Sequence, residues 1–100
     1  MARGAVPIRE KEFLQAVVQY ARLQGWVYYH PWVSIRSAAG FPDLVLVRPP
    51  RVLFVELKTG GRKPTPAQQH WLAQLGACPQ VEVYLWTPDC WAEIEQTLRR

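Results

Sequence analysis

Apolar residues recur with a helical period at the start of the chain and with strand-like spacing through its middle. Between residues 8 and 24, apolar side chains repeat every three or four positions, which predicts an amphipathic helix. Gly25 is suited to end this helix, because glycine readily adopts the left-handed conformation found there. Residues 1–7 lack this pattern and are expected to form a flexible tail, which leaves residues 8–100 as one domain.

Three strands are expected after this helix. Residues 26–35 are rich in aromatic and β-branched side chains but contain Pro31, so an edge position in the sheet is expected. Residues 43–47 and 52–57 are apolar on both faces, as in central strands that helices cover on both sides.

The second half of the chain predicts a helix, a strand and a further helix. Thr65-Pro66-Ala67-Gln68 places Thr at the N-cap, Pro at the first helical position and Gln at the third, the pattern of a capping box. This helix is expected to end near Leu75, with a strand over 81–86 and a last helix opened by Thr87-Pro88. The predicted fold is α/β: an α-β-β-β-α-β core with a C-terminal helix, in which helices flank a mixed sheet. The third and fourth strands should be parallel across the crossover helix.

The connection between the two central strands determines which of their side chains face one another. Antiparallel pairing about Pro49-Pro50 joins residues whose numbers sum to 99, so Asp43 should face Glu56. Lys58 should lie on the same face as Glu56, because side chains alternate along a strand. Opposed carboxylates repel one another, and a divalent cation between them would turn the pair into a binding site. A loop of odd length would shift this register by one residue.

Composition narrows the class of protein without defining a function. The chain has 100 residues, 49% hydrophobic and 20% charged, as expected for one globular domain. A net charge of +4 is compatible with a polyanionic partner. No long apolar run occurs, so neither a membrane span nor a signal peptide is expected. The two cysteines do not form a CxxC motif, so reduced thiols and a cytoplasmic location are expected.

Asp43, Glu56 and Lys58 have the chemistry that phosphodiester hydrolysis needs. Carboxylate oxygens are the hard ligands that Mg²⁺ or Mn²⁺ prefers, and a metal so held can activate and orient a water molecule. Lys58 would donate to that water or to the phosphate, and the backbone carbonyl of Leu57 is a candidate for a further ligand. The structural alternatives are a turn residue at Asp43 and a solvated ion pair between Glu56 and Lys58.

These motifs resemble those of the PD-(D/E)xK nuclease superfamily. Gly40-Phe41-Pro42-Asp43, then Glu56-Leu57-Lys58, then Gln68 are similar, more narrowly, to the VRR-NUC family of virus-type replication and repair nucleases. The resemblance extends over nearly the whole chain and implies a restriction-endonuclease-like fold. It also implies a Mg²⁺- or Mn²⁺-dependent DNA endonuclease, with Asp43, Glu56, Lys58 and a helix glutamate as its catalytic set. The resemblance to small stand-alone members of the family further implies a homodimer that acts on branched DNA such as four-way junctions.

The helix glutamate implied by the resemblance is either Glu10 or Glu12. Its spacing from the apolar stripe favours Glu10 as a catalytic residue and metal ligand, with Glu12 as the alternative. Gln68 would support the site, although the capping box explains this residue equally well. Candidates for contact with DNA phosphates are Arg62, Lys63 and Arg36.

Other interpretations stay open at this point. The chain could be a DNA-binding module of the same fold without catalytic activity, or a nuclease for linear or flapped DNA. His30 has no companion ligands in the sequence, and no role is assigned to it. Trp32, beside the proline of the first strand, is a candidate for a subunit or DNA interface.

Overall fold

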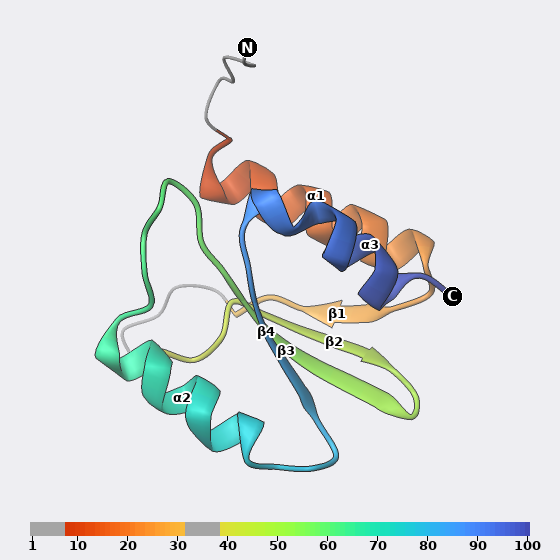
Figure 1. Ribbon diagram of the computed structural model, residues 1–100. Coiled ribbons are helices and arrows are strands. Elements are labelled where there is room, and N and C mark those ends of the chain that lie inside the picture. Colours follow the sequence, from red (N-terminus) through yellow and green to blue (C-terminus); the bar gives the residue numbers. More distant parts are fainter. Residues whose placement is uncertain (1–7, 32–38) are drawn as a thin grey trace.

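The computed structural model describes residues 8–31 and 39–100, so the predicted tail over residues 1–7, Trp32 and Arg36 lie outside the described residues. The elements follow the predicted order (Figure 1). They are α1 (Glu10–Leu23), β1 (Val27–Tyr29), β2 (Leu44–Arg48), β3 (Arg51–Leu57), α2 (Pro66–Gly76), β4 (Glu82–Trp86), a 3₁₀ turn (Pro88–Cys90) and α3 (Trp91–Leu98). Within the described ranges, no helix combines the length and apolar character needed to span a membrane.

A four-stranded mixed sheet forms the centre of the domain, in the order β1-β2-β3-β4. The first two pairings are antiparallel, and β3 pairs in parallel with β4 across α2, as predicted. The β2–β3 register runs from Arg48 opposite Arg51 to Leu44 opposite Val55, so every pair sums to 99. The predicted register is therefore confirmed. The two residues of the turn, Pro49 and Pro50, are joined by a cis peptide bond.

The first strand is shorter than the sequence predicts. β1 contains only Val27–Tyr29 and ends before Pro31, which has no amide hydrogen to give to a strand ladder. The prediction of a strand over 26–35 is therefore wrong in length, and residues 32–35 lie outside the described part. Its expected edge position is confirmed, since among the described strands β1 pairs with β2 alone.

Helices cover both faces of the sheet, and the core lies on one of them. α1 and α3 pack side by side on that face, while α2 lies against the other (Figure 1). Side chains from α1, α3 and the three long strands fill the core. They include Phe13, Val17, Ala21, Leu44, Leu46, Leu53, Val55, Leu57, Trp86, Ile94 and Leu98. Among the tryptophans, Trp26 and Trp86 are buried, whereas Trp71 and Trp91 are only half-buried.

The C-terminal end of α1 forms as the sequence predicts. Gly25 has a φ of 89°, and its amide donates to the carbonyl of Arg22. The next amide, of Trp26, donates to the carbonyl of Ala21. These two bonds form a Schellman motif, which satisfies the last carbonyls of the helix. The motif turns the chain sharply, so that β1 runs back beside α1.

Candidate active site

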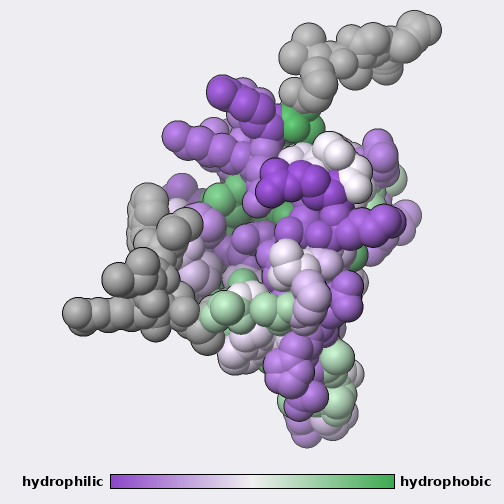
Figure 2. Space-filling model, turned by 90° about the vertical axis from the view of Figure 1, so that its left-hand side faces the viewer, coloured by the Kyte–Doolittle hydropathy of each residue, from purple (hydrophilic) through white to green (hydrophobic). Residues whose placement is uncertain are grey.

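Asp43 and Glu56 lie at the end of the sheet where β2 begins and β3 ends. They continue the hairpin register one step beyond the pair of Leu44 and Val55, so the two carboxylates share a face as predicted. Both α1 and α2 begin near this end of the sheet (Figure 1). Figure 2 shows this side of the molecule, where hydrophilic side chains cover most of the described surface. The two carboxylates therefore lie at a polar end of the domain.

Glu56 is a buried carboxylate that pairs with one cation. Only 1% of it is exposed, and Lys58, also buried, places its Nζ atom 3.3 Å from Oε2. No described residue donates a hydrogen bond to either carboxylate oxygen of Glu56. Burying a charge costs several kcal/mol unless it is paired and hydrogen-bonded. The alternative of a solvated ion pair is therefore wrong, because this pair lies inside the domain.

The electrostatics of Glu56 differ from those of an ordinary surface carboxylate. Burial, and after it the negative charge of Asp43, raise the pKa of Glu56 to about 7, although the Lys58 ammonium acts in the opposite direction. A carboxylate made unfavourable by burial and by a like charge gains most from a bound cation. Such a perturbed group is typical of a functional site.

Asp43 connects three strands through its carboxylate and its backbone. Its Oδ2 atom accepts a hydrogen bond of 2.9 Å from the amide of Leu57, which ties the start of β2 to the end of β3. Its carbonyl oxygen lies 2.8 Å from Nδ1 of His30, which must therefore be the donor. The bond to Leu57 reaches across the sheet, so Asp43 does more than cap its own turn.

His30 is a site residue that the sequence did not identify. It follows β1 and lines the same cavity as Asp43. The predicted strand contained His30, but nothing in the sequence gave the register of that strand against β2. Its position depends on pairs such as Tyr29 with Val45, which bring the end of β1 to the start of β2.

Aromatic packing against α2 holds the segment that precedes Asp43. The indole Nε1 of Trp71 donates to the carbonyl of Ala39 over 3.1 Å. The ring of Phe41 packs edge-on against both Trp71 and Phe54, with centroids 5.0 and 6.2 Å away. Such pairs stabilise a fold by about 0.5–1.5 kcal/mol each beyond the area they bury. The position of Asp43 therefore depends on α2, although this helix lies on the face opposite the core.

Gly40 makes the closest contact between this segment and α2. Its φ is 86°, and a Cβ atom built on it would lie 2.4 Å from the backbone carbon of Ala67. Only glycine fits both the backbone conformation and the space. The glycine of the Gly40-Phe41-Pro42-Asp43 motif thus has a structural role in bringing Asp43 to the site.

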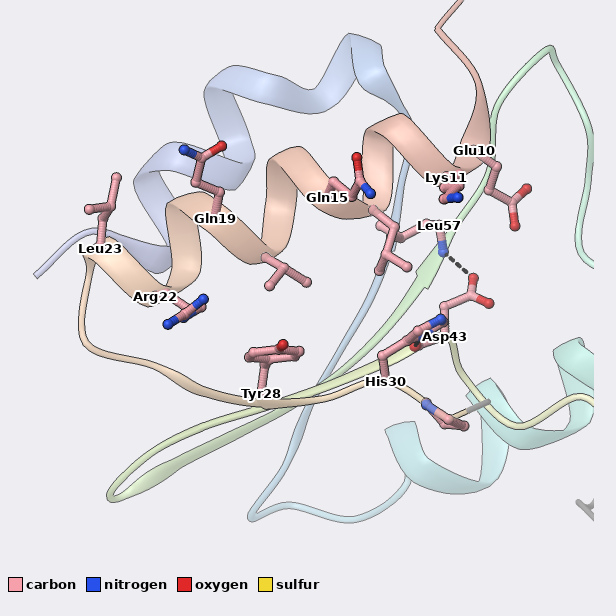
Figure 3. A pocket seen from close by; sticks show the side chains of 13 residues that line it. Glu10, Lys11, Gln15, Gln19, Arg22, Leu23, Tyr28, His30, Asp43 and Leu57 are labelled. Atoms are coloured by element: carbon pink, nitrogen blue, oxygen red, sulfur yellow. Dashed lines mark hydrogen bonds between the residues drawn. The ribbon is translucent and has the colours of Figure 1, made fainter. Parts of the chain in front are cut away.

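The structure distinguishes the two helix glutamates by position. Glu10 and Asp43 line the same cavity, of about 1140 Å³ (Figure 3). Glu12 is exposed, and its Oε1 atom accepts a hydrogen bond of 3.1 Å from the backbone amide of Arg9. This bond, more than the nearby charge of Arg9, lowers the pKa of Glu12. The geometry favours Glu10 as the helix glutamate, and its catalytic role stays a prediction.

Gln68 takes part in the predicted capping box. Its side-chain Oε1 atom accepts a hydrogen bond of 2.9 Å from the backbone amide of Thr65. The backbone amide of Gln68 donates to the Thr65 hydroxyl over 3.2 Å. The structural role of Gln68 is thereby confirmed. A supporting role in catalysis stays a prediction. The backbone of Gln68 does lie close to Gly40, whose added Cβ atom would be 2.7 Å from the Gln68 amide nitrogen.

The residues predicted to contact DNA are placed only in part. Arg62 and Lys63 are exposed on the loop between β3 and α2, directly after Lys58 and Thr59. Gly60 and Gly61 in the same loop have φ values of 64° and 71°. The loop therefore carries its two cations just beyond the carboxylates, and contact with DNA stays a prediction.

The donor set fits a hard divalent cation that keeps much of its water. In the part of the chain that the structure describes, no three His, Cys, Asp or Glu side chains lie close enough to hold a metal. A site such as tetrahedral zinc, which needs three or four protein ligands, does not fit. Mg²⁺ commonly binds through one or two carboxylates and retains several waters. Asp43 and the two oxygens of Glu56 that lack donors suit that coordination.

The architecture and the carboxylate site define an α/β domain with a nuclease-type fold, and comparison with known proteins gives its family. The family model described as "VRR-NUC domain" matches residues 32–87, more than half of the chain. The protein therefore belongs to the VRR-NUC family, which is a family of nucleases. The matched region contains Asp43, Glu56, Lys58 and Gln68 but not Glu10.

Two solved structures share the fold. One, named "VRR_NUC domain protein", superimposes with a TM-score of 0.72 at 20% sequence identity, covering 93% of this chain and 89% of that one. The other, named "VRR_NUC domain", has a TM-score of 0.70 at 20% identity, covering 87% and 90%. No curated protein matches the chain significantly. The structural similarity to these two proteins confirms the predicted fold class.

Replacing Gly40 tests how tightly α2 holds the segment before Asp43. Gly40→Ala should lower the free energy of unfolding by about 1–3 kcal/mol more than Gly61→Ala, because a Cβ atom on Gly40 would clash with the backbone of α2 whereas one on Gly61 would meet open space. Both glycines have positive φ, so Gly61→Ala controls for backbone strain. Urea unfolding measures both values, and equal losses would contradict the close contact with α2.

The raised pKa of Glu56 predicts a pH dependence of stability in metal-free protein. Between an unfolded pKa of 4.5 and a folded pKa of about 7, the folded state retains a proton that the unfolded state has released. Stability should therefore fall as pH rises through this window, by a total on the order of a few kcal/mol. Urea unfolding in EDTA at several pH values should show this slope in the wild type and in the exposed control Glu95→Gln. Glu56→Gln should remove it, and a slope that persists in Glu56→Gln would contradict the assignment.

Proposed function

We propose that this protein is a divalent-metal-dependent endodeoxyribonuclease. The observation that carries the proposal is the buried carboxylate of Glu56, which faces Asp43, pairs with Lys58 and has two oxygens without described donors. Family membership supports DNA as the substrate. Asp43 lines a cavity together with Glu10, so a phosphodiester would approach the cluster from the side of Asp43.

Asp43 and Glu56 would hold the metal ion, with the backbone carbonyl of Leu57 as a further candidate ligand. Glu10 lines the same cavity as Asp43 and would join the ligands only by moving closer, since the described residues contain no group of three carboxylates placed to hold a metal. Bound Mg²⁺ or Mn²⁺ lowers the pKa of a water molecule and offsets negative charge on the phosphate. The hydrogen bond from the Leu57 amide orients the carboxylate of Asp43. Glu56 is buried and paired with Lys58, which limits the positions that its carboxylate can adopt.

Lys58 would act on the substrate side of the ion. Its ammonium group lies 3.3 Å from Glu56 and only 7% of the residue is exposed, so its charge is weakly screened by water. From there it can donate a hydrogen bond to the attacking water or to a phosphate oxygen, where negative charge develops during hydrolysis. The pairing with Glu56 also limits the positions that the lysine side chain can adopt.

Contacts that position the DNA would come from the loop beyond the site. Arg62 and Lys63 are exposed there and would bind phosphates without reading sequence, and Arg36 is proposed for the same role. We further propose that the enzyme acts on branched DNA, such as a four-way junction, in the cytoplasm. This preference is drawn from the family resemblance and is the step most in need of a direct test.

A homodimer would allow paired cuts. Each chain of 100 residues carries one candidate site, whereas symmetric cleavage of a junction requires two cuts on opposite strands. A two-fold dimer presents two sites in a fixed relation, as in most small homo-oligomers. The proposal therefore includes two chains per active particle.

A panel of DNA substrates separates the proposal from its alternatives. With Mg²⁺ or Mn²⁺, the wild type should cut a four-way junction faster than a flap or a linear duplex. Asp43→Ala and Lys58→Ala should lose about 10²-fold or more in rate while they still fold and bind DNA. Asp89→Ala removes an exposed carboxylate on the 3₁₀ turn and should cut at the wild-type rate.

Each outcome of that panel has a distinct meaning. Cleavage by purified Asp43→Ala protein would contradict the site. Preference for a flap or a linear duplex would favour the alternative nuclease specificity. Binding without cleavage, together with no heat of Mn²⁺ binding, would favour an inactive DNA-binding module.

The oligomeric state can be measured without a substrate. Light scattering coupled to size-exclusion chromatography should give a mass twice that of the 11.5 kDa chain at micromolar concentration. A monomeric mass, both alone and with a bound junction, would contradict the homodimer and leave the metal site unaffected.

A further inference from the structure

A groove leads from the candidate active site along the whole length of α1. It is the cavity of about 1140 Å³ that contains Glu10 and Asp43 at one end and Leu23 at the other. Figure 3 looks into it, with α1 on one side and β1 on the other. An occupant of this groove would be continuous with a phosphodiester held at Asp43.

Polar and basic side chains of α1 line one side of the groove. Lys11, Gln15, Gln19 and Arg22 are spaced by four, four and three residues, which places them along one side of the helix. At a rise of about 1.5 Å per residue, Lys11 and Arg22 are separated by about 16 Å along the helix axis. Neither has an ion-pair partner in the described ranges. Their positive charges are thus available to an anionic ligand.

The interior of the groove is apolar and contains an aromatic ring. Leu14 and Val18 also line the groove. Tyr28 extends from β1 toward α1 between Arg22 and His30 (Figure 3). Tyr28 is 43% exposed, which leaves much of its ring accessible. Its neighbour Tyr29 belongs to the other face of the sheet, because side chains alternate along the strand. The groove therefore combines a stacking surface with two cations about three helical turns apart.

We propose that this groove binds an unpaired DNA strand that runs from the scissile phosphate along α1. A base stacks on Tyr28, and phosphates of the same strand contact Lys11 and Arg22. Aromatic rings combined with basic grooves are the general means of binding single strands without sequence preference. This inference rests on the proposed function, to which it adds the kind of DNA segment that lies next to the cut.

The chemistry of the groove favours an unpaired strand over a duplex. In a duplex the base faces are stacked on one another, so none is available to Tyr28. An unpaired strand can turn its bases toward Leu14, Val18 and Tyr28 while its phosphates face the basic rim. Such a groove would also give a reason for selecting branched DNA, in which unpaired nucleotides can arise at the branch point.

Binding of a fluorescent single-stranded oligonucleotide in EDTA tests the stacking contact without cleavage. Tyr28→Ala should weaken binding by at least about fivefold, the lower end of measured losses for one stacked base. Tyr29→Ala, which removes the same ring from the opposite face of β1, should change the affinity by less than about twofold. A matched duplex should bind equally to both variants. Tyr28→Leu keeps an apolar side chain and should show the same loss if Tyr28→Ala does not fold.

The salt dependence of the same binding tests the phosphate contacts. Each phosphate contact to a single strand contributes about 0.7 to the slope of log affinity against log salt. Arg22→Ala and Lys11→Ala should each reduce the slope by about that amount. Arg99→Ala removes an equal charge from an exposed position after α3 and should leave the slope unchanged.

Several results would overturn the proposal. Equal affinities for Tyr28→Ala and Tyr29→Ala would exclude stacking in the groove. A changed molecular mass of Tyr28→Ala with unchanged oligonucleotide binding would make the groove a contact between copies of the chain. The two proposals can fail separately. A wild type that cuts no DNA would overturn the nuclease proposal while the binding comparison stands, and unchanged affinities in an active enzyme would overturn only the groove.

Discussion

The opposition of Asp43 and Glu56 at the end of the β2–β3 hairpin is the interaction on which the rest of the site depends. The register of that hairpin places one carboxylate directly across from the other, and the surrounding fold buries Glu56 almost completely. A fold gains nothing from such a pair by itself, because burial and the nearby charge both disfavour the ionised form. Lys58 offsets only part of this cost. The divalent cation that we propose between the two carboxylates would offset the rest of this cost.

The two helical layers have different tasks around this pair. α1 and α3 pack on one face and supply most of the core, which keeps β2 and β3 in place. α2 lies on the other face and holds the segment before Asp43 through Gly40, Phe41 and Trp71. The site lies near the first residues of α1 and α2, so the stability of the domain and the geometry of the site depend on partly separate sets of contacts. Changes on α2 should therefore disturb the site more than their effect on the core would suggest.

Much of this arrangement could be predicted from sequence because it depends on local spacing. The pairing across Pro49-Pro50 required only residue numbers, and the capping box of Thr65 and Gln68 required only four adjacent residues. The parallel pairing of β3 with β4 followed from the general handedness of crossovers. By contrast, His30 meets Asp43 through a strand pairing separated by a long connection, and no local pattern gives that register. Glu10 and Glu12 differ only in the direction in which α1 presents them, so only the structure could show that Glu10 lines the cavity with Asp43.

Calorimetric titration with Mn²⁺ near pH 6.5, in buffers of different ionisation enthalpy, tests the central claim most directly. At this pH Glu56 should hold a proton in much of the population, because its pKa is raised to about 7. Binding of an ion by Asp43 and Glu56 must displace that proton. The account predicts one Mn²⁺ per chain, a measurable proton release in the wild type, and loss of both in Glu56→Gln. Binding of equal strength in Glu56→Gln, or binding without proton release in the wild type, would contradict it.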